Sequence, residues 1–419
     1  MSSPPVRDFV PLAPGEWIHN PGYLKLDLML KGVRIGAAAL AASEALGDLV
    51  SDFGSMGDLD IVLPEGTRVS VPFAKDFAHR SPYLLTKEDG RFQIRHGDER
   101  VQVEWDPPSE FYRASTSSGV PLSRIGVIHG QYLALAPNRA CSFIGQRTEC
   151  KFCSAVLTQK EDPRERSVDD VLETIEFALR AQGNLSMVYL AMGYTDAEDH
   201  GIATLEPYIR AIKRHFDLLV SVDVLPPETD DWIDRTYAMG VDALSYNLEV
   251  WDPTRFEEYC PGLHENVGRD RFLQALTYAV GIFPAGAVAC HLIVGLDRPL
   301  STVDGIDWLT QNGIVPVLPL FRPFKGIDLR DQLEEIPATE EVAAVYGYLY
   351  QALKDRRIPM TWVRDLSVVT TPLEGRHFVG EEAKLQVFLQ SFFNSKLGRR
   401  TAVGLAEMRR ALRVREVDG

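Results

Sequence analysis

The stretch MVYLAMGYTDAEDHGIATLEPYIRAIKRHFDLLVSVDV, residues 187–224, contains two aliphatic runs separated by a helical pattern. Residues 187–191 and 218–224 have the length and β-branched content of short buried strands. Residues 205–215 place apolar side chains at helical spacing between them. A strand, a helix and a second strand in this order form the unit that builds a parallel sheet. The stretch therefore predicts an α/β fold.

The same unit recurs on both sides of this stretch. The further predicted strands cover residues 132–136, 243–248, 288–294 and 315–320. The further predicted helices cover residues 168–181, 230–239, 269–280 and 302–311. About six units of this kind predict a parallel β/α barrel, partial or complete, whose chemistry gathers at the carboxyl ends of its strands.

The two ends of the chain have different patterns. Residues 36–49 predict an alanine-rich helix, and residues 58–105 alternate with the period of a β-meander. We therefore expect an α+β N-terminal domain over residues 1–120, a barrel core over 121–337 and a mainly helical C-terminal extension over 338–419, with a short strand at 360–363. We also expect the N-terminal domain, including the segment at 111–130, to cover the barrel mouth or shape its pocket.

Composition narrows the function. The chain has 419 residues, is 45% hydrophobic and 25% charged, and carries a formal net charge of −15. This charge repels phosphate backbones, which argues against a nucleic-acid substrate and favours a small molecule or a peptide. The basic segment at 396–415 reads as a solvated helix. No apolar run approaches the ~20 residues that span a bilayer, and the N-terminus lacks a secretory pattern, so we expect a cytoplasmic protein with reduced thiols.

Three of the five cysteines fall within the segment CSFIGQRTECKFC, residues 141–153. It follows the first predicted barrel strand, and such clustering of thiols is typical of a metal site. A [4Fe–4S] cluster usually takes four thiolates. Three would leave one iron open to an amino acid that chelates through its amino and carboxylate groups, such as a methionine that carries a sulfonium.

Other interpretations of these cysteines remain open. A zinc-stabilised binding protein on a barrel scaffold would use Cys150 and Cys153 with a distant ligand such as His129 or His291. A thioredoxin-like redox pair would leave Cys141 without a role. Three unrelated buried cysteines would fit poorly with the charged residues between them.

Over residues 131–325 the chain resembles the radical S-adenosylmethionine (SAM) superfamily. That family's commonest signature has three residues between its first two cysteines and two before the third, which follows an aromatic residue. Here eight residues fill the first gap, the second gap is intact, and Phe152 occupies the aromatic position. The resemblance implies a [4Fe–4S] cluster on Cys141, Cys150 and Cys153.

The same resemblance implies the chemistry. Such enzymes cleave SAM reductively and abstract hydrogen from a substrate through a 5′-deoxyadenosyl radical, with electrons from a donor such as flavodoxin or ferredoxin. Phe152 would then pack against adenine. The residues after the second strand, Met192, Gly193 and Tyr194, resemble the family's Gly-Gly-Glu region, of which Gly193 is the matching residue.

Further SAM contacts are expected after later strands. Asn247 and Glu249 share side-chain parity at a strand end and could bond ribose or the methionine carboxylate. Ile293 and Gly295 match the Gly-x-Ile-x-Gly stretch that backs adenine in the family. Asp223 ends the third strand, where it could bind ribose or substrate.

Two basic residues are also candidates for the functional site. We expect His291 either to carry a proton or to be a core histidine whose hydrogen bonds are satisfied. Arg322, after the sixth strand, could hold a carboxylate.

Overall fold

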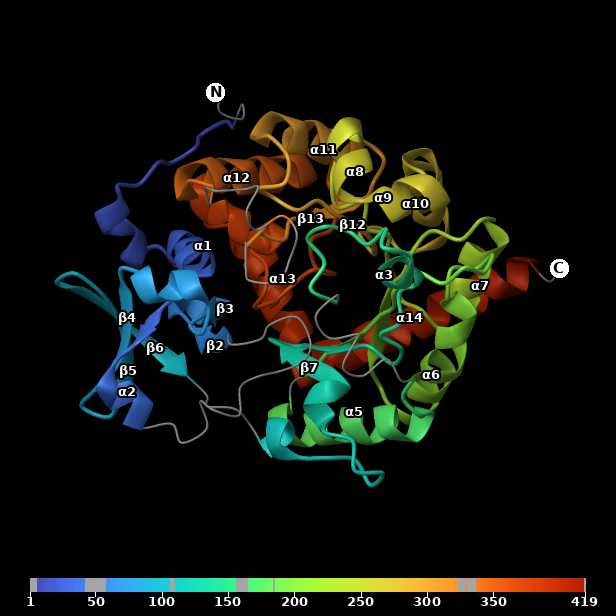
Figure 1. The fold of residues 1–419 in the computed structure, drawn as a ribbon, viewed down its shortest axis with the longest axis horizontal. Helices are drawn as coiled ribbons and strands as arrows, with labels where there is room; N and C mark the ends of the chain where they lie inside the picture. Colours follow the sequence, from blue (N-terminus) through green and yellow to red (C-terminus); the bar gives the residue numbers. More distant parts are fainter. Residues whose placement is uncertain are drawn as a thin grey trace.

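The computed structural model of the protein describes residues 6–41, 58–105, 110–155, 165–183, 185–322, 329 and 337–417. Within these residues the strands form a six-stranded and a seven-stranded sheet, which lie side by side in Figure 1. The predicted α/β class is confirmed.

The six-stranded sheet has the order β1-β4-β5-β6-β2-β3. Its strands are β1 (Arg34–Ile35), β2 (Asp58–Val62), β3 (Arg68–Pro72), β4 (Tyr83–Glu88), β5 (Arg91–His96) and β6 (Glu99–Trp105). Strands β4 to β6 form the predicted meander. Asp89 and Gly90 both have positive φ, 48° and 77°, as a tight hairpin turn requires.

Helices flank this sheet. Helix α1 (Pro21–Lys31) packs on β3 and begins at Asn20, whose side chain accepts hydrogen bonds from the Gly22 and Tyr23 amides. The helix predicted at 36–49 is described only as α2 (Ala37–Ala41), because residues 42–57 lie outside the described part of the chain.

The seven-stranded sheet has the order β13-β12-β11-β10-β9-β8-β7. Its strands are β7 (Gly126–His129), β8 (Tyr132–Leu135), β9 (Met187–Ala191), β10 (Leu219–Asp223), β11 (Ala243–Ser245), β12 (Val288–His291) and β13 (Val315–Val317). Strands β8 to β13 are parallel, as predicted, and β7 pairs antiparallel with β8. Because β7 and β13 are the two edges, the sheet is a partial barrel.

Helices connect the parallel strands and surround them in Figure 1. They are α3 (Ser142–Gln146), α5 (Val168–Gln182), α6 (Ile202–His215), α7 (Asp231–Ala238), α8 (Pro253–Tyr259), α9 (Pro261–Asn266), α10 (Arg269–Ile282) and α11 (Pro299–Gln311). The Ser167 hydroxyl caps α5 by accepting a hydrogen bond from the Asp170 amide at 3.0 Å. The predicted helices agree with α5, α6, α7, α10 and α11 within about three residues.

The C-terminal segment is mainly helical, as predicted, with α12 (Thr339–Asp355), the 3₁₀ helix η8 (Pro372–Phe378), α13 (Lys384–Asn394) and α14 (Lys396–Val417). The prediction of a short strand at 360–363 is wrong, since these residues form a turn. Tyr132 lies in the same small core as Val403 and Ala406 of α14, so α14 covers the amino-terminal ends of the barrel strands.

The basic helix α14 is largely exposed, as predicted, but two of its arginines turn toward the barrel. Arg399 donates to the Leu185 carbonyl at 2.6 Å, and Arg410 bonds the buried Asp242 carboxylate at 2.5 Å. Buried carbonyl and carboxylate oxygens at the ends of the barrel elements need hydrogen-bond donors, and these two guanidinium groups supply them.

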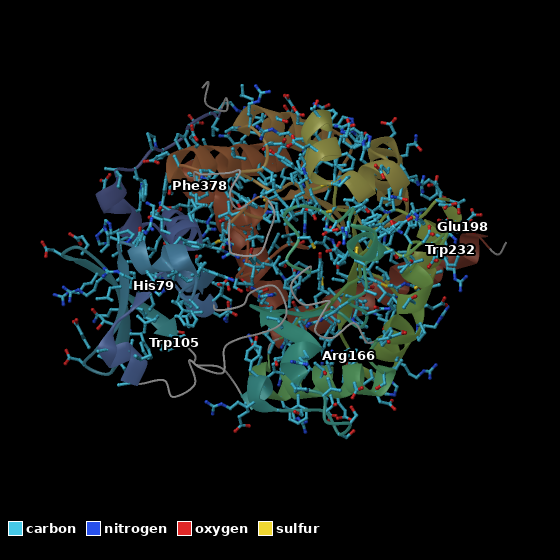
Figure 2. All side chains as sticks on the ribbon, viewed as in Figure 1. His79, Trp105, Arg166, Glu198, Trp232 and Phe378 are labelled. Carbon is cyan, nitrogen blue, oxygen red and sulfur yellow. The ribbon has the colours of Figure 1, made fainter. Side chains whose placement is uncertain are left out.

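One hydrophobic core contains residues of both sheets and of the C-terminal helices. Side chains fill the space between these elements in Figure 2, where Phe378 marks the region in which η8 packs against Tyr23 of α1. The domain boundaries at residues 120 and 337 stay predictions. Among the described residues, no helix is long and apolar enough to span a bilayer.

Candidate functional site

A pocket of about 340 Å³ opens at the carboxyl ends of β8, β9, β10 and β11. This is the edge of the parallel sheet at which barrel enzymes assemble their chemistry, and the volume suits a small ligand. The lining residues are Lys75, Ala136, Asn138, Arg139, Cys141, Phe143, Cys150, Phe152, Cys153, Ser154, Ala155, Ala191, Met192, Gly193, Tyr194, Asp223, Leu225, Asn247, Glu249 and Leu263.

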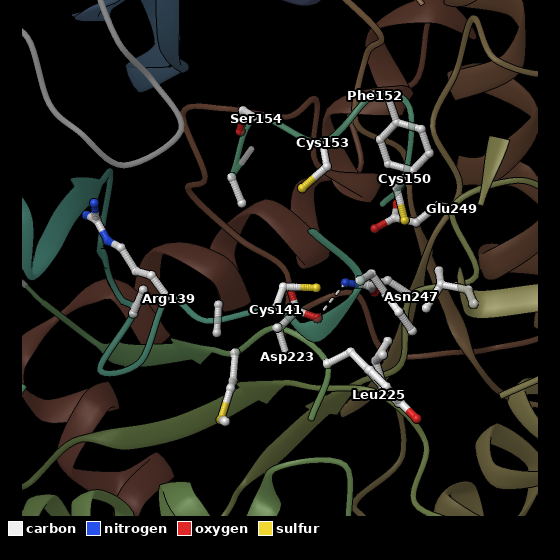
Figure 3. Close-up of a pocket in the computed structure, with 18 of the residues that line it drawn as sticks. Arg139, Cys141, Cys150, Phe152, Cys153, Ser154, Asp223, Leu225, Asn247 and Glu249 are labelled. Carbon is white, nitrogen blue, oxygen red and sulfur yellow. Dashed lines mark hydrogen bonds between the residues drawn. The ribbon is translucent and has the colours of Figure 1, made fainter. Parts of the chain in front are cut away.

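The segment between β8 and α5 carries all three cysteines of the predicted cluster. Cys141 has extended backbone and precedes the short helix α3, which ends at Arg147 with a left-handed φ of 62°. The eight residues of the long first gap therefore form one helical turn and its exit, which brings Cys150 back toward Cys141 (Figure 3).

Hydrogen bonds to two neighbouring loops fix this cysteine loop. The Ser142 amide donates to the Tyr194 carbonyl at 2.9 Å, which ties the loop to the end of β9. The Lys151 amide donates to the Tyr259 carbonyl, and the Gly262 amide donates to the Thr148 carbonyl, both at 2.9 Å. Gly262 must be glycine at this contact, because a Cβ atom would lie 2.6 Å from that carbonyl oxygen.

The three thiols line the same pocket and affect one another. Burial raises the pKa of Cys141, and burial and the neighbouring Cys150 raise the pKa of Cys153 to about 12. A hydrogen bond with Cys260, together with burial, raises the pKa of Cys150 well above its ordinary value. Because thiols ligate metals as thiolates, a cation that binds here must displace their protons.

This donor set fits an iron–sulfur cluster better than a single ion. Among the described residues, no group of three or more histidine, cysteine, aspartate or glutamate side chains is arranged to hold one metal ion. Zinc needs four donors around one ion, so the zinc interpretation is not favoured. In a [4Fe–4S] cluster each thiolate binds a different iron, and three sulfurs around a pocket match that requirement.

A buried polar network follows β10 and β11. The Asn247 amide donates to Asp223 Oδ1 at 2.7 Å, and the Tyr189 hydroxyl donates to Asp223 Oδ2 at 2.8 Å (Figure 3 draws the first bond). Asn247 Oδ1 accepts from the His291 amide at 3.0 Å and from the Ser245 hydroxyl at 2.5 Å. Asn247 is thereby held in one orientation at the pocket wall.

Glu249 lies beside Cys150 in Figure 3. Its φ of 68° is unusual for a residue other than glycine, and bonds from the Glu249 amide to His291 and from the Ile293 amide to Glu249 hold it in place. Burial, followed by the charge of Asp223, raises the pKa of Glu249 well above its ordinary value. Strand β11 ends at Ser245, so Asn247 and Glu249 lie on the following loop and not at the end of the strand predicted at 243–248.

The pocket gathers most of the predicted SAM contacts. Phe152, Met192, Gly193, Tyr194, Asp223, Asn247 and Glu249 all line it. Tyr194 also stacks on Phe143, with ring centroids 4.1 Å apart, which braces the cysteine loop against the end of β9.

Four candidates are not brought into the pocket. Ile293 and Gly295 are absent from its lining, and a Cβ atom on Gly295 would lie 3.1 Å from Pro337, so that glycine faces protein. His291 does not line the pocket either, and burial lowers its pKa to about 4, as for a core histidine. Arg322 pairs with Asp58 of β2 at 3.3 Å.

Sequence reasoning missed four polar lining residues, of which Ser154 directly follows Cys153. Asn138 and Arg139 precede Cys141 by two or three positions, and that proximity was the available signal. Lys75 follows β3 of the other sheet, and nothing in the sequence links it to the cysteines. The N-terminal domain was expected at the mouth, and its residue Lys75 does line the pocket. No residue of the segment at 111–130 lines it, and β7 in that segment extends the edge of the sheet instead.

Asp223 is expected to make the folded state less stable as the pH rises from about 4 to 6. Burial raises its pKa from 3.8 to about 6, so the folded state favours the protonated carboxyl. The stability it contributes is fully present below the unfolded pKa and is lost as the pH rises through the folded pKa. Asp223→Asn should remove this part of the pH dependence, as measured by chemical denaturation at several pH values. Parallel wild-type and variant curves would contradict the prediction.

The chain is similar to known proteins over part of its length. No protein-family model matches the chain. A curated bacteriochlorophyllide c C-7(1)-hydroxylase from Chlorobaculum limnaeum is 25% identical over 138 residues, which cover 31% of this chain and 34% of that protein. The match thus spans about a third of the relative's length.

Two solved structures illustrate the structural similarity. A methylornithine synthase gives a TM-score of 0.44 at 13% identity, with 54% of this chain and 63% of that chain covered. A radical SAM methyltransferase from Sphaerobacter thermophilus gives a TM-score of 0.41 at 15% identity, with 68% of this chain and 78% of that chain covered.

Proposed function

We infer that this chain is a radical SAM enzyme, and we propose that Cys141, Cys150 and Cys153 hold its [4Fe–4S] cluster. The observation that carries the proposal is the convergence of these thiols on one pocket at the carboxyl ends of a parallel sheet. When bound, the cluster and SAM would supply a 5′-deoxyadenosyl radical that abstracts hydrogen from the substrate.

Two groups of lining residues divide the work of binding. Phe152 and the segment formed by Met192, Gly193 and Tyr194 offer apolar surface and backbone groups for adenine and methionine. Asn247 and Glu249 offer hydrogen-bond partners for ribose hydroxyls or the methionine amino group.

Asp223 acts through Asn247. Both of its carboxylate oxygens already accept hydrogen bonds, from Tyr189 and from Asn247. We therefore assign Asp223 to the orientation of Asn247, which it holds together with the Ser245 hydroxyl and the His291 amide.

The remaining assignments follow from composition and from the superfamily. The substrate is a small molecule or a peptide, the electrons come from a donor such as flavodoxin or ferredoxin, and the protein acts in the cytoplasm. The burial of the thiols fits this chemistry, since a reduced cluster must be kept away from water and from stray donors.

Anaerobic reconstitution with iron and sulfide tests the proposal. The protein should turn brown, absorb broadly near ~400 nm and bind about four irons per chain. Addition of SAM and dithionite should then yield 5′-deoxyadenosine, measured by chromatography. A colourless protein that retains zinc would overturn the proposal.

A further inference from the structure

Exposed apolar side chains are concentrated on the last two helices. Among the described residues, seven of the eleven exposed large hydrophobic side chains belong to α13 and α14. Three of them, Leu385, Phe388 and Leu389, are on α13, which packs against α14. Scattered exposed leucines need no explanation, but a concentration of them marks a surface that contacts a partner or a membrane.

The other four form a stripe along α14, the helix that runs across the barrel to the C terminus in Figure 1. Each of the four is between 52% and 68% exposed. At 3.6 residues per turn they fall within an arc of about 80°. On the opposite side of the helix, Val403 and Ala406 pack with Tyr132 in the small core at the barrel. This outer stripe consists of Leu397, Leu405, Met408 and Leu412.

Basic side chains border the outer stripe on both sides. The helical spacing places Arg400 about 60° before the stripe and Arg409 about 40° beyond it, and both side chains are exposed. Lys396 is exposed on the Arg400 side, together with one acidic residue, Glu407. The sequence of α14 contains seven lysine or arginine residues and two glutamates, whereas the whole chain has a net charge of −15. The stripe therefore lies in a basic region of an acidic protein.

A second copy of the chain is a poor match for this stripe. Pairing of two α14 helices would bring their basic borders together, and like charges across an interface oppose association. An electron-donating protein fits no better. Helix α14 covers the amino-terminal ends of the barrel strands, whereas the three thiols lie at the carboxyl ends.

A bilayer surface with anionic lipids matches both features of the stripe. A helix that lies in the membrane interface buries its leucine and methionine side chains at the edge of the acyl chains, while flanking arginines reach the headgroup phosphates. From Leu397 to Leu412 the stripe is about 22 Å long, so all four side chains can contact one flat surface. Acidic residues elsewhere on the chain oppose this weakly, because charges are screened beyond about 8 Å at physiological ionic strength.

We propose that the outer stripe of α14 docks the protein on a bilayer surface that contains anionic phospholipid. Arg400 and Arg409 would contact the lipid phosphates, and the four apolar side chains would enter the interface. Docking through this face leaves the pocket accessible, because the pocket lies at the other end of the strands. The proposal does not depend on the cluster or on SAM.

Co-sedimentation of the full-length protein with lipid vesicles tests the proposal. One set of vesicles contains equal parts of phosphatidylglycerol and phosphatidylcholine, and the other contains phosphatidylcholine alone. The salt concentration is about 0.15 M, at which distant charges are screened. Wild-type protein should bind the anionic vesicles at least about tenfold more tightly than the neutral ones, because several basic residues meet the lipid phosphates.

Two double variants separate the contributions of charge and apolar surface. Arg400→Gln with Arg409→Gln should weaken binding to anionic vesicles at least about tenfold, whereas Arg400→Lys with Arg409→Lys should retain it. Leu405→Gln with Met408→Gln should also weaken it at least about tenfold, because two apolar side chains no longer enter the interface. Leu300→Gln replaces an exposed leucine of α11 and should bind like the wild type. All replaced side chains are exposed, so thermal unfolding should be unchanged.

Three results would overturn the proposal. The first is wild-type protein that stays in the supernatant with anionic vesicles, whatever else covers the stripe. The second is binding that neither glutamine double variant weakens, which would place the lipid contact elsewhere. The third is a wild-type dimer in sedimentation velocity that Leu405→Gln with Met408→Gln converts to a monomer while vesicle binding is absent, which would assign the stripe to a second copy. Failure of the proposed function appears separately, as absence of iron after reconstitution.

Discussion

Replacing Cys141, Cys150 and Cys153 together with alanine is expected to abolish iron–sulfur binding and the formation of 5′-deoxyadenosine. All three sulfurs line one pocket, and alanine offers no ligand in their place. Iron analysis after reconstitution should fall from about four irons per chain to the background, and chromatography should detect no nucleoside product.

Cys290→Ala is the matched control. Cys290 is fully buried and does not line the pocket, so its loss should leave the iron content unchanged. Retention of about four irons by the triple variant would contradict the assignment of the ligands.

Gly193→Ala is expected to have the second-largest effect. A Cβ atom at this position would lie 2.6 Å from the Ala140 carbonyl oxygen and 2.7 Å from Cys141 Cβ, closer than atoms can approach. The neighbour is the backbone that carries the first cysteine, so relief of the clash must move Cys141. We expect the rate of 5′-deoxyadenosine formation to fall at least about tenfold, equivalent to ~1.4 kcal/mol.

Gly145→Ala provides the comparison within the same loop. No atom lies within 4 Å of a Cβ at Gly145, so this variant should cleave SAM at a rate close to that of the wild type. Equal activity of both variants would show that the end of β9 does not need to approach the cysteine loop.

The fold was predictable where periodicity is strong. Strand β9 has the predicted bounds of 187–191, and α5 begins at the predicted residue, Val168, after its cap Ser167. Strands β11, β12 and β13 end three residues earlier than predicted. Their apolar runs continue past the assigned strand ends because the side chains there, such as Leu248, Leu292 and Leu318, stay buried.

The candidate site was predictable in part, because its thiols and strand-end residues are close in sequence to the parallel strands. Asn247 follows from its position after a parallel strand, whereas Phe152 and Gly193 were implied by the resemblance to the radical SAM superfamily. Lys75 could not be predicted in this way, since it reaches the pocket through packing between two sheets. Gly295 was expected to back adenine from its motif, but it packs against Pro337.

The account depends on one iron of the cluster being left open to SAM by the three thiolates. Electron paramagnetic resonance of the reconstituted, dithionite-reduced protein tests this most directly. We expect a [4Fe–4S]⁺ signal whose g values change when SAM is added, because the methionine group then ligates the open iron. A reduced-cluster signal that SAM leaves unchanged, or the absence of any cluster signal, would contradict the account.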